Sequence, residues 1–189
     1  RSSIVNAGDG FHEHPTQALL DALTIRQRLK TLRGLKIAIV GDILHSRVAL
    51  SNILLHQKLG NEIALVGPPS LVPVEFEKLG ATVTYDIRRG VKNADVVMML
   101  RVQAERGARN YFPSIREYRN LFAIDRTIFA LAARRAILMH PGPINRDVEI
   151  ETSMADSDQS VILQQVTNGI AVRMAVLYLL KGEIHEALN

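Results

Sequence analysis

The sequence predicts an α/β fold, a doubly wound, Rossmann-like parallel sheet of about five strands flanked by helices. Two β-branched apolar runs, residues 36–41 and 62–67, each end in glycine. Continuous apolar runs of this kind suit strands that are buried on both faces of a parallel sheet. Segments with helical spacing separate the runs, and alternating strands and helices form right-handed βαβ units. In such open sheets, ligands bind at the carboxyl ends of the strands.

Three further apolar runs, residues 81–85, 95–100 and 136–140, bring the number of candidate strands to five. Between the strands, residues 48–59 and 75–79 have helical spacing, and Gly60 and Gly80 supply their C-terminal stops. Polar, glycine-containing residues 101–116 are expected to form a loop.

Two long helical patterns, residues 15–32 and 161–180, bracket this unit. The second is apolar around most of its circumference, so one small domain is not expected to cover it. Elements of this kind could belong in part to a neighbouring unit.

Composition narrows the class of protein. The 189 residues carry a net charge of +4, with 47% hydrophobic and 22% charged residues, as in ordered globular proteins. The absence of cysteine excludes a disulfide framework, a thiolate nucleophile and a cysteine-ligated metal. No apolar run reaches the roughly 20 residues of a membrane span, and we expect no export signal. Basic residues are spread along the chain, so we expect small anionic substrates and no nucleic-acid partner. Because there is no long apolar run, we expect no membrane partner. Because there is no cysteine, we expect a cytoplasmic location.

The first candidate cluster lies at residues 8–17, where a turn, two histidines and a proline precede a helix. Pro15 suits the first helical turn, which places His14 at the helix start and Gln17 one turn on, on nearly the same face. A histidine donor and an amide there could bind a carbonyl oxygen and an amino group of a small ligand. The alternatives are helix capping and a weak metal pair formed with His12.

The second cluster, residues 41–47, follows the first candidate strand and precedes a helix. Arg47 at the helix start is placed to bind an anion that the helix also favours. The alternative is a surface arginine with Asp42 as a local turn or cap residue. The G-x-G-x-x-G spacing is missing, so a nicotinamide cofactor is not expected.

The third cluster, residues 100–106, follows the fourth candidate strand. Arg101 and Gln103 are two positions apart, so an extended backbone points both side chains the same way. A guanidinium beside an amide suits a carboxylate. Glu105 and Arg106 are either an ion pair that shapes the loop or solvated charges.

The fourth cluster, residues 139–146, follows the fifth candidate strand. Pro141 and Pro143 around Gly142 fix the backbone and leave carbonyl groups with no local helix to bond them. Such carbonyls could accept hydrogen bonds from an amine or amide ligand, and the alternative is a rigid structural turn. We expect this cluster and the two before it to converge on one sheet edge, with the first joining them from its helix start.

Together these segments resemble the aspartate carbamoyltransferase family. The related ornithine enzymes typically have His-Pro-Cys-Gln and His-Cys-Leu-Pro at the corresponding places and lack the Arg-Val-Gln of residues 101–103. The acceptor implied by the resemblance is therefore aspartate. The resemblance covers nearly the whole chain and is carried by residues 6–10, 14–21, 41–42, 45–49, 101–103, 105–106, 140–143 and 165–173.

The resemblance implies transfer of a carbamoyl group from carbamoyl phosphate to L-aspartate, in pyrimidine biosynthesis, without a cofactor, a metal or a covalent intermediate. His14 would bind the carbamoyl oxygen and stabilise the oxyanion. Gln17 and the backbone around Pro141 and Gly142 would hold the amino group. Arg47 would bind one aspartate carboxylate, and Arg101, oriented by Gln103, would bind the other.

The resemblance also implies parts that this chain does not carry. The family's phosphate-binding Ser-Thr-Arg-Thr motif, and the Ser and Lys lent by a neighbouring subunit, belong to an amino-terminal domain. We therefore expect an interdomain helix region at residues 1–20, an aspartate-binding domain at 21–160, and a helix at 161–189 that packs on the amino-terminal domain. Leu50 stands where many relatives have arginine, which is expected to weaken a local salt bridge or alter activity.

Family relatives are homotrimers, sometimes joined by regulatory chains or dihydroorotase, and we expect the same kinds of partner here. The alternative function is a non-catalytic structural subunit of a pyrimidine-pathway complex. Loss of His14, Arg47 or Arg101 would have favoured that alternative, and all three are kept. A nucleotide-binding module is disfavoured by the missing glycine fingerprint.

Overall fold

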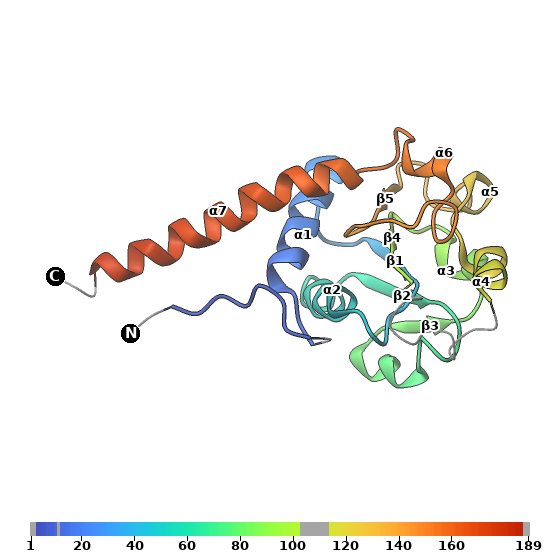
Figure 1. Cartoon of the computed structure of the whole chain (residues 1–189), viewed down its shortest axis with the longest axis horizontal. Helices are drawn as coiled ribbons and strands as arrows, with labels where there is room; N and C mark the ends of the chain where they lie inside the picture. Colours follow the sequence, from blue (N-terminus) through green and yellow to red (C-terminus); the bar gives the residue numbers. More distant parts are fainter. Residues whose placement is uncertain (1–2, 11, 103–113, 187–189) are drawn as a thin grey trace.

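The centre of the molecule is a five-stranded, all-parallel sheet in the order β3-β2-β1-β4-β5. The computed structural model in Figure 1 shows the strands in this order. The structure describes residues 3–10, 12–102 and 114–186. All five predicted strands and the predicted parallel sheet are confirmed. The strands are β1 (Lys36–Val40), β2 (Glu62–Val66), β3 (Thr82–Thr84), β4 (Val96–Met99) and β5 (Ile137–Met139).

Both faces of the sheet are buried, as the continuous apolar runs indicated. Along β1, Ile37 and Ile39 face one core cluster, and Ala38 and Val40 face the other. The first cluster is covered by the helices at the start of the chain, and the second by the short helices between β3 and the C-terminal segment. An alternating pattern is absent from β1, β2, β4 and β5, which are buried on both faces beyond their first residues, whereas the edge strand β3 is only partly buried.

Eight helical segments surround the sheet in the described residues, and four were predicted from their spacing. Residues 75–79 form a 3-10 helix rather than an α-helix. The four that were missed have at most eight residues each, too few to show a helical period. The segments are α1 (Pro15–Leu29), α2 (Arg47–Lys58), η1 (Val74–Leu79), α3 (Ile87–Val91), α4 (Ile115–Phe122), α5 (Arg126–Phe129), α6 (Thr152–Ala155) and α7 (Ile162–Glu186).

The predicted loop at residues 101–116 is wrong at its end, because α4 begins at Ile115. Ser114 caps this helix by accepting a hydrogen bond from the backbone N–H of Glu117 at 3.1 Å. The serine therefore starts a helix that the polar composition of the segment had concealed.

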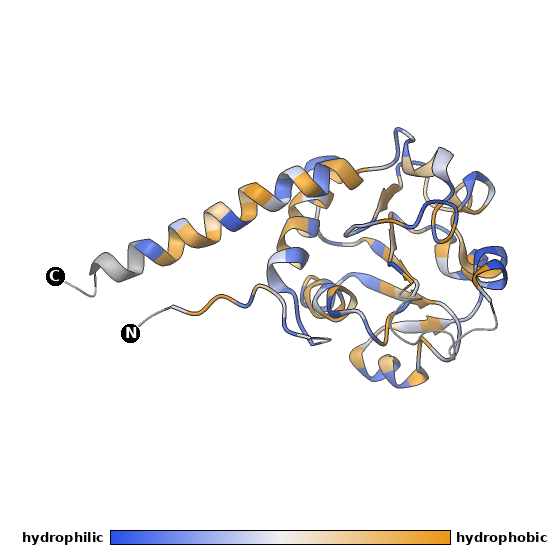
Figure 2. Ribbon diagram, in the orientation of Figure 1, coloured by the Kyte–Doolittle hydropathy of each residue, from blue (hydrophilic) through white to orange (hydrophobic). Residues whose placement is uncertain are grey.

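Helix α7 packs against α1 near its start and then projects away from the body of the molecule (Figure 1). Figure 2 shows apolar residues continuing along this projecting part. Within the part of the chain that the structure describes, no helix is long and apolar enough to cross a membrane. The large exposed apolar side chains of α7 are Leu163, Val166, Ile170, Met174, Leu177, Tyr178 and Leu179.

The order of the strands creates a crevice between the carboxyl ends of β1 and β4. From β1 the chain builds outward through β2 to β3, and α3 then carries it back across the sheet to β4 on the other side of β1. The loops after β1 and β4 therefore leave in different directions, which is where ligands of doubly wound sheets bind. Gly41, at φ +134°, allows this close approach, because a Cβ there would lie 2.8 Å from the carbonyl oxygen of Leu100.

Candidate functional site

A cavity of about 350 Å³ lies at the carboxyl ends of β1, β4 and β5 and brings the four predicted clusters together. Six of the seven predicted site residues line it: His14, Gln17, Arg47, Arg101, Pro141 and Gly142. The seventh, Gln103, lies outside the described residues, as does the expected pair of Glu105 and Arg106. The remaining lining residues are Gly10, His45, Ser46, Val48, Leu100 and Pro143.

His14 is the N-cap residue of α1, with Pro15 in the first helical turn as the spacing predicted. Its side chain makes no capping hydrogen bond, so capping by the imidazole is not its local role. Its backbone N–H donates to Ser51 Oγ on α2 at 2.8 Å, and the Ser51 hydroxyl in turn donates to Glu13 Oε2. These bonds hold the start of α1 against α2. Among the described residues, no group of three or more His, Asp or Glu side chains is arranged to hold a metal ion.

The imidazole of His14 is kept neutral by its surroundings. Burial lowers its pKa, and the positive charges of Arg47 and Arg173 lower the pKa further. Thr16 Oγ1 lies 3.5 Å from Nδ1. In the neutral tautomer whose Nδ1 accepts from this hydroxyl, Nε2 carries the proton and is a hydrogen-bond donor.

Gln17 is buried one turn further along α1, and its amide has a defined direction. Its Nε2 donates to Asp21 Oδ1 at 3.0 Å. Since Gln17 also lines the cavity, its carbonyl oxygen Oε1 is the atom left to accept a hydrogen bond from a ligand.

Arg47 is the first residue of α2, where Ser46 is the N-cap and accepts a hydrogen bond from the backbone N–H of Ala49. The glycine at position 8, at φ +121°, lies against its guanidinium, and a Cβ there would come within 2.9 Å of Arg47 Cζ. A cation and a helix N-terminus thus share one place, and both favour an anion.

The loop between β1 and α2 also places His45 in the cavity, which sequence reasoning did not select. Asp42 accepts hydrogen bonds from His45 Nδ1 at 2.8 Å and from the His45 backbone N–H at 3.2 Å. Asp42 is therefore a turn residue, as the structural alternative for this cluster predicted, and it also orients the imidazole of His45. The signal that could have found this pair is the i, i+3 spacing of an aspartate and a histidine directly after a strand.

Arg101 enters the cavity from β4, on the other side of the crevice from Arg47. The strand end before it is held by the Leu100 N–H, which donates to the Val40 carbonyl at 2.8 Å. Arg101 itself is partly buried. The two arginines lie after β1 and β4, which are neighbours in the sheet, but are 54 positions apart in the sequence.

Buried side chains fix the loop after β5. The His140 N–H donates to Gln165 Oε1 of α7, and the Gly142 N–H donates to His140 Nδ1, both at 2.9 Å. His140 Nε2 lies 3.4 Å from Glu149 Oε1, and both side chains are fully buried. Pro141 and Gly142 thus project into the cavity from a rigid base.

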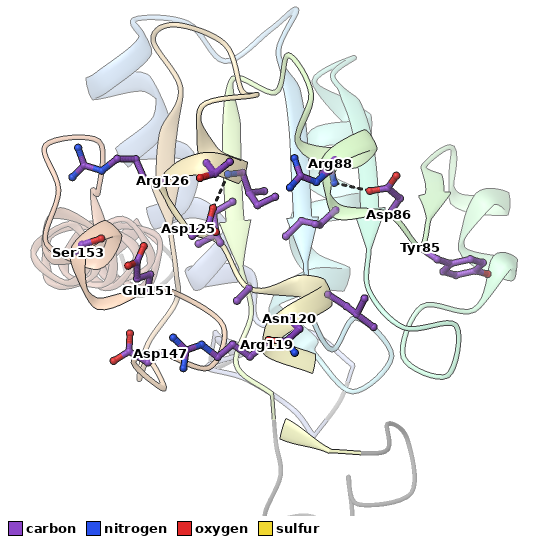
Figure 3. Close-up of a pocket in the computed structure, with 16 residues that line it drawn as sticks. Tyr85, Asp86, Arg88, Arg119, Asn120, Asp125, Arg126, Asp147, Glu151 and Ser153 are labelled. Atoms are coloured by element: carbon purple, nitrogen blue, oxygen red, sulfur yellow. Dashed lines mark hydrogen bonds between the residues drawn. The ribbon is translucent and has the colours of Figure 1, made fainter. Parts of the chain in front are cut away.

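A larger hollow of about 810 Å³ is lined mainly by α3, α4 and α5 and the residues beside them. Figure 3 shows the side chains that line it. None of the predicted site residues in the described part of the chain lines it. Three of its four carboxylates serve local structure: Asp86 and Asp125 accept hydrogen bonds at the N-termini of α3 and α5, and Asp147 accepts from the backbone N–H and hydroxyl of Thr152. The smaller cavity therefore carries the functional argument.

The fold and the smaller cavity define a class: a doubly wound α/β domain with an arginine-lined cavity at its topological switch point, the place where ligands of such sheets bind. Residues 33–180 match the family model described as aspartate/ornithine carbamoyltransferase, Asp/Orn binding domain. The match covers most of the chain, which belongs to this family.

Individual relatives point to the aspartate branch. The chain is 56% identical over 180 residues to the aspartate carbamoyltransferase catalytic subunit of Endomicrobium trichonymphae, covering 95% of this chain and 58% of that one. It is 53% identical to the same subunit of Ruminiclostridium cellulolyticum, covering 100% and 61%. The chain thus spans about three fifths of the length of these relatives.

Among solved structures, aspartate transcarbamoylase from Trypanosoma cruzi in complex with N-(phosphonacetyl)-L-aspartic acid matches with a TM-score of 0.79 and 31% identity. That match covers 92% of this chain and 57% of the other. Ornithine carbamoyltransferase from Thermus thermophilus matches with a TM-score of 0.77 at 22% identity, over 93% and 58%, which shows the shared fold.

Proposed function

We propose that this chain supplies the aspartate-binding half of an aspartate carbamoyltransferase active site. The observation that carries the proposal is the cavity in which Arg47 and Arg101 flank His14 and Gln17. The two cations reach this place from different strand ends, while the uncharged donor and acceptor come from α1. Support for aspartate as the acceptor comes from the identity to aspartate carbamoyltransferase catalytic subunits.

The carbamoyl group fits the polar atoms contributed by α1 and the loop after β5. The neutral His14 donates from Nε2 to the carbamoyl oxygen, which becomes an oxyanion during the reaction. Gln17 Oε1 and backbone carbonyls around Pro141 and Gly142 accept the two N–H bonds of the amino group.

The two arginines suit a dicarboxylate. Arg47 binds one carboxylate of aspartate and Arg101 binds the other, each by the paired donors of a guanidinium. Ornithine has a side-chain ammonium where aspartate has its second carboxylate. It would bring this positive charge into a cavity whose described lining carries two arginines and no acidic side chain. The charge of the lining therefore disfavours ornithine.

Transfer proceeds by direct attack. The lone pair of the aspartate amine forms the new C–N bond, and the carbamoyl C=O becomes a tetrahedral oxyanion facing His14. The C–O bond to phosphate then breaks, the C=O re-forms, and the departing phosphate takes the proton from the amine. Proximity and electrostatic stabilisation supply most of the rate.

The same proposal extends to the chain's organisation. In this proposal residues 1–20 are the interdomain helix region and residues 21–160 the aspartate-binding domain. The exposed apolar face of α7, in the C-terminal segment 161–189, packs on an amino-terminal carbamoyl phosphate domain. The exposed fraction of Leu163 is 83% and that of Tyr178 is 79%, which is costly in water. The assembly is a cytoplasmic homotrimer of complete subunits.

The test is production of N-carbamoyl-L-aspartate from carbamoyl phosphate and L-aspartate, by this chain with and without an added amino-terminal domain from the family. Activity only in the mixture is the expected result. An assembled mixture that makes no product would favour the non-catalytic structural subunit and would direct attention to Leu50.

A binding test needs only the chain itself. Titrating the ¹⁵N-labelled chain with L-aspartate is expected to shift the backbone signals of Arg47, Leu100 and Arg101. Arg101→Ala should weaken this response, whereas Arg126→Ala, which removes an exposed arginine that lines the other hollow, should leave it unchanged. Equal weakening by both variants would mean that general charge, not the cavity, attracts aspartate.

A further inference from the structure

A buried carboxylate lies directly behind the candidate site. Asp21, on α1, is completely buried and accepts three hydrogen bonds from neutral side-chain amides. Oδ1 accepts from Gln17 Nε2 at 3.0 Å and from Gln165 Nε2 at 2.8 Å, and Oδ2 accepts from Asn52 Nδ2 at 2.9 Å. The donors come from α1, α7 and α2, so this one side chain joins three helices.

The chemistry of a carboxylate determines which way each amide points. An ionised carboxylate only accepts hydrogen bonds, so every amide beside it must turn its NH₂ group toward it and its carbonyl oxygen away. For Gln165 the result is visible, because its Oε1 accepts the N–H of His140 at 2.9 Å. For Gln17 the same rule turns Oε1 toward the cavity that Gln17 lines.

We propose that Asp21 is a positioning residue that fixes the Gln17 amide with its carbonyl oxygen toward the cavity and, through Gln165, anchors the loop that carries Pro141 and Gly142. The proposal rests on the proposed function where it treats the carbamoyl amino group as the partner of Gln17. Asp21 touches no substrate in this scheme and acts only through the amides it orients.

The consequence is selectivity for a ligand with an NH₂ group. Asp21 positions two sets of acceptors: Gln17 Oε1 directly, and the carbonyls of the Pro141 loop through Gln165. A carbamoyl amino group offers one proton to each set. An acetyl group of similar size offers a methyl group and leaves both acceptors without partners, which is unfavourable in a partly buried site. If the Gln17 amide were reversed, its NH₂ would face the ligand's NH₂.

The geometry can be tested in the unaltered chain by NMR. A scalar coupling through the hydrogen bond, between Gln17 ¹⁵Nε2 and Asp21 ¹³Cγ, is expected together with slow solvent exchange of the Gln17 NH₂ protons. Absence of the coupling, with the Gln17 NH₂ protons exchanging as fast as those of exposed glutamines, would overturn the proposal without any substitution.

Substitutions separate positioning from simple stabilisation. Asp21→Asn has the same shape but places an NH₂ group among three donors, so the Gln17 NH₂ signals should lose their protection. The matched control is Asn52→Ala, which removes a different bond to Asp21 and leaves the Gln17 bond in place. It should lower stability while keeping the Gln17 signals protected. Identical Gln17 signals in the two variants would overturn the proposal.

Kinetics in the complex with an amino-terminal domain give a second readout. Asp21→Asn is expected to raise KM for carbamoyl phosphate about tenfold, with little change in KM for aspartate, and to reduce the preference for carbamoyl over acetyl phosphate. Added to Gln17→Ala, it should have a smaller effect than in the unaltered chain, because the part of its loss that acts through Gln17 is already gone and only the part that acts through Gln165 remains. Fully additive losses would show that Asp21 acts through stability alone.

The experiments distinguish failure of the proposed function from failure of the role assigned to Asp21. If the complex makes no carbamoyl aspartate while the Gln17 coupling and protection are present, the proposed function fails and the orientation of Gln17 stands. If the complex is active and the coupling is absent, the assignment of Asp21 fails and the proposed function stands.

Discussion

His56 offers a quantitative test of the buried core, because its environment excludes the charged imidazolium. The side chain is fully buried near the end of α2. Its Nδ1 faces Asn61 Nδ2 at 2.9 Å, and that amide also donates to the Leu32 carbonyl, while Asn61 Oδ1 accepts from the Leu35 N–H. The Asn61 amide is therefore fixed as a donor to His56, and a proton on Nδ1 would oppose it.

Burial lowers the pKa of His56 to about 4, from an ordinary value of 6.5. Between these values the unfolded chain binds more protons than the folded chain, so stability falls as the pH falls. Lowering the pH from 7 to 5 should therefore cost about 2 kcal/mol of the free energy of unfolding through His56 alone. Asp21 acts in the opposite direction: burial raises its pKa to about 6, so its folded carboxyl gains a proton first as the pH falls.

The comparison that isolates His56 is urea unfolding of the wild type and His56→Asn at pH 7 and pH 5. Asparagine keeps an acceptor for Asn61 and cannot titrate, and the contribution of Asp21 is common to both proteins. The wild type should lose about 2 kcal/mol more than the variant between the two pH values. If the difference in stability between the two proteins is the same at both pH values, burial of a neutral His56 does not hold.

Two further predictions concern backbone geometry and surface charge. Gly41→Ala should lower the free energy of unfolding by about 2 kcal/mol or more, since its Cβ would meet the Leu100 carbonyl at 2.8 Å. The control Gly60→Ala has a positive φ but open space around its Cβ, and equal losses in urea unfolding would refute the role of the contact. Arg146 pairs with Asp156 through two contacts of 2.8 Å, and both side chains are exposed. Because exposed ion pairs contribute little to stability, Arg146→Ala should leave the urea midpoint essentially unchanged. A clear drop in the midpoint would mean that the pair stabilises the fold.

The strands were predictable because a strand buried on both faces has consecutive apolar residues. Residues 37–40 are apolar on both faces, and a run of this kind needs no distant partner to be recognised. The short helices were not predictable in the same way. Helix α5 has four residues, and it forms because Asp125 caps it and Ile128 and Phe129 reach the core, which are properties of its surroundings.

The candidate site divides along the same line. His14, Arg47 and Arg101 could be selected from the chain because each follows a turn or a strand end. Their common cavity could not be measured until the strand order placed β1 beside β4. His45 was missed because its orientation depends on a hydrogen bond to Asp42 that spacing alone does not establish.

The sequence by itself determined the fold class, the strand segments and the positions of the candidate ligands, because these depend on local hydrophobic periods and on turn residues at strand ends. The tertiary structure alone decided which polar groups meet. Gln165 and Asp21 are 144 positions apart, yet they share a hydrogen bond that orients one side of the cavity. The physical reason is that hydrophobic burial is encoded residue by residue, whereas the direction of a buried amide is imposed by partners that only the folded chain brings within reach.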